Sequence, residues 1–253
     1  MRKLALSVVL ALASPLALAG GVSTTVTLAS DYLFDGASQT QGDGAFQASL
    51  DWSGDSGFYV GTWFSNVDFG EGSTADSEVD YYGGYGWEAE GGWEFAAGFA
   101  RYTYNGSSSS NYTELTSSVT FPFGTKVLAY FADDDALGGS AYRVKGKHSF
   151  ALPADFSLDL EATHTNYSSS SPLVDFNHAQ VGVSRAFGPV TAYLGYSDTD
   201  DSDDVTRGAR CCLRCPPRLT CSPTDLRFYT KARIVSGARF SFVRRMHPTP
   251  SHA

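Results

Sequence analysis

AFQASLDWSGDSGFYVGTWF, residues 45–64, holds the pattern that decides the fold. Apolar and polar residues alternate strictly over its first part, and a short turn of Ser, Gly and Asp leads to a second aromatic run. Successive side chains of a β-strand point to opposite faces, so this alternation predicts a strand with one polar and one apolar face. The apolar face must contact either a protein core or lipid, and it is formed by Phe46, Ala48, Leu50 and Trp52.

The composition of the whole chain suits a sheet protein with many turns. The 253 residues are enough for one large all-β domain or two ordinary domains. Aromatic residues reach 14%, glycines number 26, and charged residues make up only 18%. The net charge of −9 argues against a nucleic-acid partner, which would need a basic surface.

The N-terminus is typical of a secretory signal peptide. Arg2 and Lys3 precede an apolar run, Leu4 to Leu18, and Ala17-Leu18-Ala19 offers small residues at a cleavage site. Residues 1–19 are therefore expected to be removed, and the mature chain would begin at Gly20. The alternative is a membrane anchor, which Pro15 and the short apolar run disfavour.

The chain after Gly20 divides into strand-like runs, many of them near the length of about 9–11 residues at which a tilted strand spans a bilayer. Eleven are expected, at Val22–Phe34, Ala45–Trp52, Phe58–Val67, Glu78–Trp87, Trp93–Tyr104, Tyr112–Phe121, Thr125–Ala132, Tyr142–Leu152, Ser157–Tyr167, Phe176–Phe187 and Val190–Ser197.

The connections between these runs alternate in length. Short turns are expected at 53–57, 88–92, 122–124, 152–156 and 188–189, and long polar loops at 35–44, 68–77, 105–110, 133–139 and 168–175. Segregation of long and short connections to opposite ends is typical of outer-membrane β-barrels, with short periplasmic turns and longer outer loops. A soluble β-sandwich has no reason to keep this order.

Aromatic residues gather near the ends of the expected strands. A belt at the short turns would contain Trp52, Phe58, Trp87, Trp93, Phe121 and Phe150. A second belt at the long loops would contain Tyr32, Tyr81, Tyr104, Tyr112, Tyr142, Tyr167 and Tyr196. Two aromatic belts favour a membrane barrel, whereas the core of a sandwich would collect aromatic residues in the middle of its strands.

Two stretches resemble the TorF family of porin-like proteins. They are SDYLFDGASQTQGDGAFQASLDW (30–52) and GFYVGTWFSNVDFGEGSTADSEVDYYGGY (57–85), and NYTEL (111–115) is a weaker match. The resemblance runs from about Gly20 to about Thr199. It implies an outer-membrane β-barrel and a passive channel, but no defined substrate. Asp35 stands where that family usually has a basic residue.

The chain changes character after about Val205. Residues 20–204 contain six Lys/Arg against 26 Asp/Glu, whereas residues 205–253 contain ten Lys/Arg and a single acid. The four cysteines, Cys211, Cys212, Cys215 and Cys221, all lie in this segment, which we expect to be a disordered tail. Their spacing does not match the usual pairs of zinc ligands, although a zinc or disulfide module is the alternative.

This tail stands where a twelfth strand is needed. Bacterial single-chain barrels have even strand numbers, so about twelve strands are expected and the last is missing. A frameshift near residues 204–209 would explain the loss. With one choice of codons for 209–216, the next reading frame encodes Arg-Val-Ala-Val-Ser-Val-Ala, an alternating strand.

The polar faces of the expected strands carry charges that would line the interior of a barrel. A basic row on one strand faces acids on its neighbours: the set is Arg143, Lys145, Lys147, Asp159, Glu161, Glu78, Asp80, Glu114 and Asp51. These charges would form either a narrow ion-selective pore or a salt-bridged ladder that plugs the barrel. Charge reversal at Lys145 and Lys147 should shift the ion selectivity of a pore.

Other chemistry has weaker support in the sequence. The acidic stretches 133–135 and 198–204 offer oxygen ligands to Ca²⁺, but they lack the spacing of an EF-hand, and solvated loops are the default interpretation. His178 and Ser184 share a strand face without a third orienting residue, so no catalytic set is expected. No metal site and no cofactor are expected either.

The sequence therefore predicts an all-β, antiparallel transmembrane β-barrel in the outer membrane of a Gram-negative bacterium. Its expected function is passive diffusion of small hydrophilic solutes or ions. Its expected partners are membrane lipid, lipopolysaccharide and the barrel-assembly machinery. The alternatives are a closed structural or adhesive barrel and a soluble secreted β-sandwich.

Overall fold

The computed structural model describes residues 2–14 and 20–200, and nearly all of the regular structure in them is β-strand. The prediction of an all-β antiparallel fold is confirmed. The proposed cleavage at residue 19 and the cysteine-rich segment after residue 204 involve residues that lie outside this described part. No described residue belongs to a helix that is long and apolar enough to cross a membrane.

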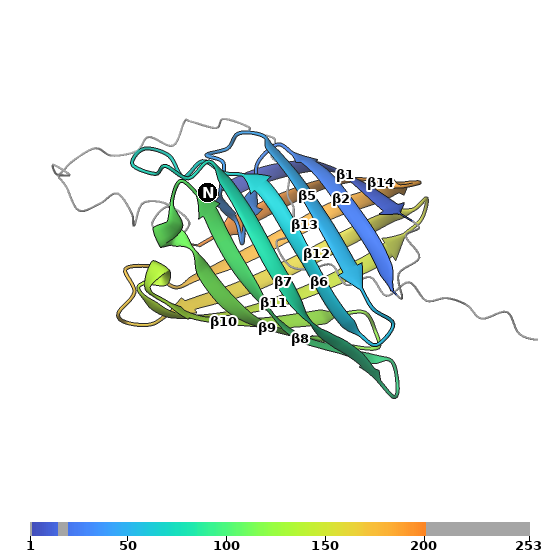
Figure 1. Ribbon diagram of the computed structural model, residues 1–253. Coiled ribbons are helices and arrows are strands. Elements are labelled where there is room, and N and C mark those ends of the chain that lie inside the picture. The colour runs from blue at the N-terminus through green and yellow to red at the C-terminus, as the bar shows by residue number, and fades with distance from the viewer. Residues whose placement is uncertain (1, 15–19, 201–253) are drawn as a thin grey trace, which may run out of the picture.

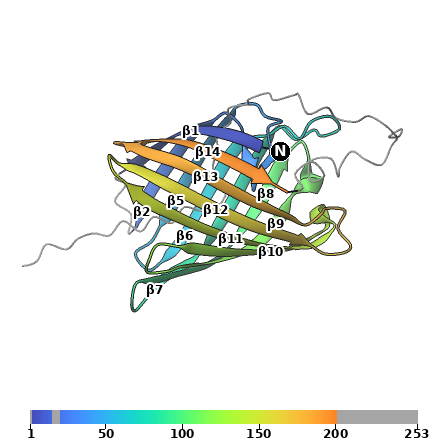
Figure 2. The same ribbon diagram turned by 180° about the vertical axis from the view of Figure 1, so that it is seen from behind.

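Eleven strands, each paired with its neighbour in the chain, form one antiparallel sheet (Figure 1). They are β2 (Gly21–Ala29), β5 (Ala45–Ser53), β6 (Phe58–Asn66), β7 (Ser77–Ala89), β8 (Trp93–Asn105), β9 (Tyr112–Thr120), β10 (Lys126–Asp134), β11 (Gly139–Leu152), β12 (Phe156–Tyr167), β13 (Phe176–Phe187) and β14 (Val190–Thr199). Figures 1 and 2 show the sheet curled on itself, so that β5–β7 lie opposite β11–β13.

The two edges of this eleven-stranded sheet, β2 and β14, are not paired with each other, so the eleven strands alone form an open sheet. The strand β1 (Arg2–Ser14) lies between the edges. It pairs with β14 from Arg2↔Asp198 to Leu10↔Val190, and with β2 from Ser7↔Ala29 to Ser14↔Val22. The segment that the sequence predicts to be a signal peptide thus pairs with both edges of the eleven-stranded sheet.

The strand boundaries agree with the sequence prediction except at the long-loop end. The first expected strand, Val22–Phe34, is wrong in its second half, because β2 ends at Ala29 and residues 33–38 form a separate hairpin. The expected long loop at 133–139 is also wrong. A 3₁₀ turn, η2 (Asp135–Leu137), and Gly138 in the left-handed conformation join β10 directly to β11. A second 3₁₀ turn, η1 (Ser108–Ser110), precedes β9.

The small hairpin consists of β3 (Leu33–Phe34) and β4 (Ala37–Ser38). Asp35 and Gly36, between the two strands, have positive φ angles of 46° and 87°. Positive φ at both central residues is the backbone of the two-residue turn that Asp-Gly favours. Ser38 and Thr40 donate hydrogen bonds of 2.5 and 2.9 Å to the Asp31 carboxylate, which ties the hairpin to the end of β2.

The two faces of the sheet have opposite chemistry, and the opening stretch shows it. Phe46 and Leu50 are 48% and 51% exposed, so the apolar face of β5 contacts no core. Gln47, between them, is 1% exposed and faces the interior. The same arrangement recurs on β11, where Tyr142 and Val144 are exposed and Arg143 and Lys145 are buried. Polar groups therefore fill the interior and large apolar groups cover the outside.

Candidate functional site

The interior at the long-loop end contains a network of buried charges that we call the lumen network: Asp35, Glu114, Arg143, Lys145, Lys147, Glu161 and His178. Alternation along β11 puts its three cations on the inner face, because residues two apart in a strand share a face. Register brings acids beside them, since Lys147 is directly opposite Glu161 of β12.

Arg143 is held between two carboxylates and two aromatic rings. Its Nη1 lies 3.3 Å from Oδ2 of Asp35 and its Nη2 lies 2.8 Å from Oε2 of Glu114. The guanidinium carbon lies 4.5 Å from the ring centroid of Phe34 and 4.1 Å from that of Tyr130. These contacts on edges and faces fix the plane of the guanidinium group.

Lys145 joins the hairpin to β12. Its ammonium group contacts Oδ1 of Asp35 and lies 3.3 Å from Oε1 of Glu161. Lys147 Nζ, nearer the short turns, lies 3.2 Å from Oε2 of the same glutamate. A single inward row of cations is therefore neutralised by acids from three separate segments of the chain.

The Asp35 carboxylate is buried and charged. Burial raises its pKa, but the neighbouring Lys145 and Arg143 outweigh that effect and lower the pKa to about 2. The turn that carries it packs against the wall. A Cβ on Gly36 would collide with the Thr199 methyl group and the His178 ring.

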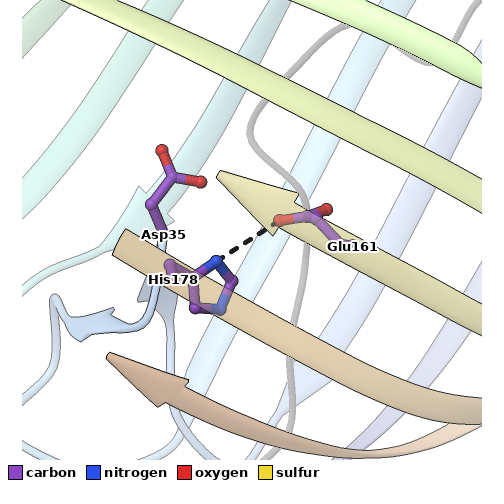
Figure 3. Close-up of side chains that lie close together, drawn as sticks. All are labelled: Asp35, Glu161 and His178. Carbon is purple, nitrogen blue, oxygen red and sulfur yellow. Dashed lines mark ion pairs between the residues drawn. The ribbon is translucent and has the colours of Figure 1, made fainter. Parts of the chain in front are cut away.

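Asp35, Glu161 and His178 come close enough together to suggest a metal site, as Figure 3 shows. His178 Nδ1 lies 3.7 Å from Oε1 of Glu161. The Lys145 ammonium group, however, already contacts both carboxylates. It supplies the positive charge that a metal ion would bring and would repel such an ion.

A second group of inward acids lies on β7. Glu78 and Asp80 are 1% and 5% exposed, and the Tyr104 hydroxyl donates a 3.2 Å hydrogen bond to Glu78. The rings of Tyr102 and Tyr112 stack with centroids 4.5 Å apart. Tyr102 also donates to Glu114, at 2.9 Å, which links this group to the lumen network.

Two of the expected interior residues lie closer to the short turns and are part-exposed. Asp51 accepts hydrogen bonds from Ser49 and Tyr82. Asp159 accepts hydrogen bonds of 2.6 Å from both Ser149 and Ser184. Ser184 therefore bonds to an acid rather than to His178.

The aromatic residues at the short-turn end form a row across β6, β7, β8 and the turn after β9. Successive ring centroids lie 4.9 Å apart for Phe58–Tyr85, 5.4 Å for Trp87–Phe95 and 4.9 Å for Trp93–Phe121. Phe150 contacts His148 at 4.2 Å further along, and Trp52 lies on β5 beside β6. The exposed members of this row are Phe58, Tyr85, Trp87 and Phe150.

The expected tyrosine belt at the long-loop end is wrong for several of its members. Tyr32 and Tyr112 are buried, at 0% and 9% exposed, and Tyr104 packs beside them around the hairpin. Alternation turns Tyr104 and Tyr112 inward, because their strand neighbours carry the outward positions. Tyr32 lies between β2 and β3 and packs against Trp63. Tyr81 and Tyr142, 54% and 55% exposed, are outward as expected.

The sequence prediction missed Asp35, Phe34 and His178 as parts of the interior. Residues 35–44 were expected to form an outer loop, whereas Asp35 is buried in the interior at the turn between β3 and β4. The Asp-Gly pair at 35–36 is a hairpin signal that was available. The Asp-Gly pair does not indicate whether the hairpin folds into the interior or points outward.

The fold and its charged interior define the class: an antiparallel all-β protein with an inside-out distribution of polarity. A family model described as "Bacterial protein of unknown function (Gcw_chp)" matches residues 13–216, and the chain belongs to this family. No curated protein matches the chain.

Proposed function

We propose that the protein is an outer-membrane β-barrel through which small hydrophilic solutes or ions diffuse passively. The observation that carries this proposal is the inverted polarity of the sheet. Leu28, Leu50 and Val144 are 50–60% exposed, whereas Glu78 and Lys145 are 1–2% exposed. Soluble proteins bury the first kind of residue and expose the second, whereas a membrane barrel does the reverse.

Three further features support a membrane location. Most connections at one end of the sheet are long and those at the other end are short, with the short β10–β11 connection as the exception. An aromatic row follows the short-turn end, and the sequence resembles the TorF family. In this proposal the short turns are periplasmic and the long loops face outward. The N-terminal segment would direct export, and lipopolysaccharide and the barrel-assembly machinery would be partners.

The closing strand is part of the same proposal. The position between β14 and β2 is one strand wide, because β1 occupies it and pairs with both edges. If residues 1–19 are removed, another strand has to fill that position before a barrel of twelve strands can close.

The hairpin of residues 31–43 would restrict the pore. Phe34 contacts Tyr102 on β8 and Arg143 on β11, while Gly36 packs against β13 and β14. The hairpin therefore crosses the interior and connects opposite walls. We propose that it acts as the constriction at the long-loop end.

A closed structural barrel is the second candidate, because the charges around the hairpin are buried and paired. Single-channel recording in planar bilayers separates the two. A pore gives stepwise currents whose selectivity changes when Lys145 and Lys147 are reversed to Glu, while a closed barrel gives none. Migration of unheated and heated samples on gels tests the barrel itself, because a soluble β-sandwich shows no heat-dependent shift.

A further inference from the structure

We propose that Arg143 and Lys145 form an anion site, that the Asp35 carboxylate is its built-in occupant, and that a small carboxylate solute takes the place of Asp35. The proposal deepens the proposed function and rests on it for the route by which a solute arrives.

The first argument is the position of the Asp35 carboxylate. One oxygen lies 3.3 Å from Arg143 and the other contacts Lys145, so two cations from alternate positions of β11 share one carboxylate. The group enters from the tip of a two-residue turn rather than from the wall. A free carboxylate of a solute could make the same contacts without the peptide chain behind it.

The second argument is the charge that remains when Asp35 is taken away. Arg143 keeps Glu114 at 2.8 Å, and Lys145 and Lys147 share Glu161 at 3.3 and 3.2 Å. Three cations then face two acids, which leaves one positive charge. One positive charge balances a singly charged group such as a carboxylate. It leaves one of the two negative charges of a phosphate dianion unbalanced.

The third argument is that the site keeps its shape without the hairpin. Tyr130 on β10 contacts the Arg143 guanidinium face, and Glu114 on β9 contacts its edge. Both partners belong to the wall of the sheet. A fixed guanidinium plane lowers the entropy cost of binding a carboxylate that bridges Arg143 and Lys145, as the Asp35 carboxylate does.

The test compares Asp35→Asn with Asp43→Asn in the full chain. Both changes remove one carboxylate from the same loop, but Asp43 is exposed, whereas Asp35 is paired with Arg143 and Lys145. Acetate is the probe, with chloride and phosphate for comparison. Binding is measured in detergent by calorimetry, and reversal potentials are measured in planar bilayers with potassium acetate.

Asp35→Asn should bind acetate about tenfold more tightly than the wild type, because a tethered competitor has been removed. Its reversal potential should shift toward anion preference. Asp43→Asn should change neither quantity, and Asp35→Asn/Lys145→Gln should lose the gained binding. Wild-type currents should saturate with acetate concentration but not with chloride, which tests the site even if Asp35→Asn does not fold.

The proposal is overturned if folded Asp35→Asn binds acetate no better than Asp43→Asn, if phosphate binds as tightly as acetate, or if the wild type conducts acetate but its currents do not saturate. Absence of currents together with strong acetate binding to Asp35→Asn would refute the pore and leave the anion site standing. Currents without that binding would refute the anion site and leave the pore standing.

Discussion

Oδ2 of Asp35 lies 3.3 Å from Nη1 of Arg143, so the tip of the first loop is joined by an ion pair to a strand on another wall of the sheet. Both side chains are buried, at 1% and 6% exposed. An ion pair in this setting is sensitive to the loss of either partner, because the remaining charge stays away from water.

Acid should release the hairpin. Burial raises the pKa of Asp35, but Lys145 and Arg143 lower it to about 2, below the value near 4 of an unfolded chain. The stability that this group contributes, on the order of 2 kcal/mol, is therefore fully present above about pH 4 and is lost as the pH falls toward 2. Urea unfolding, followed by gel migration, measures the free energy of unfolding. The value for the wild type should approach that for Asp35→Asn as the pH falls over this range.

The comparison between the wild type and Asp35→Asn separates the titration of Asp35 from that of the groups around it. Lys145, Arg143 and Glu161 face Asp35 directly, His178 packs against the turn, and Glu114 acts through Arg143. These groups are present in both proteins. A difference between wild type and Asp35→Asn that stays constant from pH 7 to pH 2 would contradict the prediction.

Glu114→Gln should destabilise the sheet by about 3 kcal/mol, because it removes one of the two carboxylates on a buried guanidinium group. It also weakens the hydrogen bond that Tyr102 donates. The urea midpoint of the detergent-folded protein measures the change. Glu88→Gln, an exposed acid at the end of β7, is the matched control and should leave the midpoint unchanged.

Val181→Arg should destabilise the protein in lipid vesicles by about 2–4 kcal/mol, because an arginine in the middle of a lipid-facing strand must leave water. Val181 is 43% exposed near the centre of β13. Glu90→Arg, in the exposed turn after β7, is the control. A soluble protein would tolerate both changes equally, and that result would count against the membrane proposal.

The isolated segment 20–200 should fail to give a heat-modifiable band after refolding. Its β2 and β14 edges would lack the partner that β1 supplies, and open edges favour aggregation. A synthetic peptide of residues 2–14 should restore the band, whereas the same peptide in scrambled order should not. Normal folding without the peptide would mean that another segment closes the sheet.

The strands were predictable because each carries its own alternation. The stretch 45–53 reads as a strand whatever surrounds it, and its exposed face in the structure is the one marked by Phe46 and Leu50. The pairing order was predictable for a similar reason, since short connections join neighbouring antiparallel strands. The inward direction of Arg143 and Lys145 follows from the same period of two.

The centre of the site was not predictable in this way. Asp35 reaches Arg143 because a loop folds back into the interior, and that direction depends on space left by side chains from several walls. Tyr32 and Tyr112 resemble belt residues in the sequence, but in the structure their side chains pack in buried clusters near the hairpin. Long-range packing of this kind has no local period.

The burial of the inner face changes along the strands. Gln47 and Thr163, toward the long loops, are 1% and 4% exposed, whereas Ser49 and Asp159, toward the short turns, are part-exposed. The obstruction thus occupies one half of the molecule, and the charged groups are asymmetric along the same axis. A conducting protein of this shape should rectify. Currents measured at voltages of equal size and opposite sign would differ, and removing the Asp35 charge would reduce the difference.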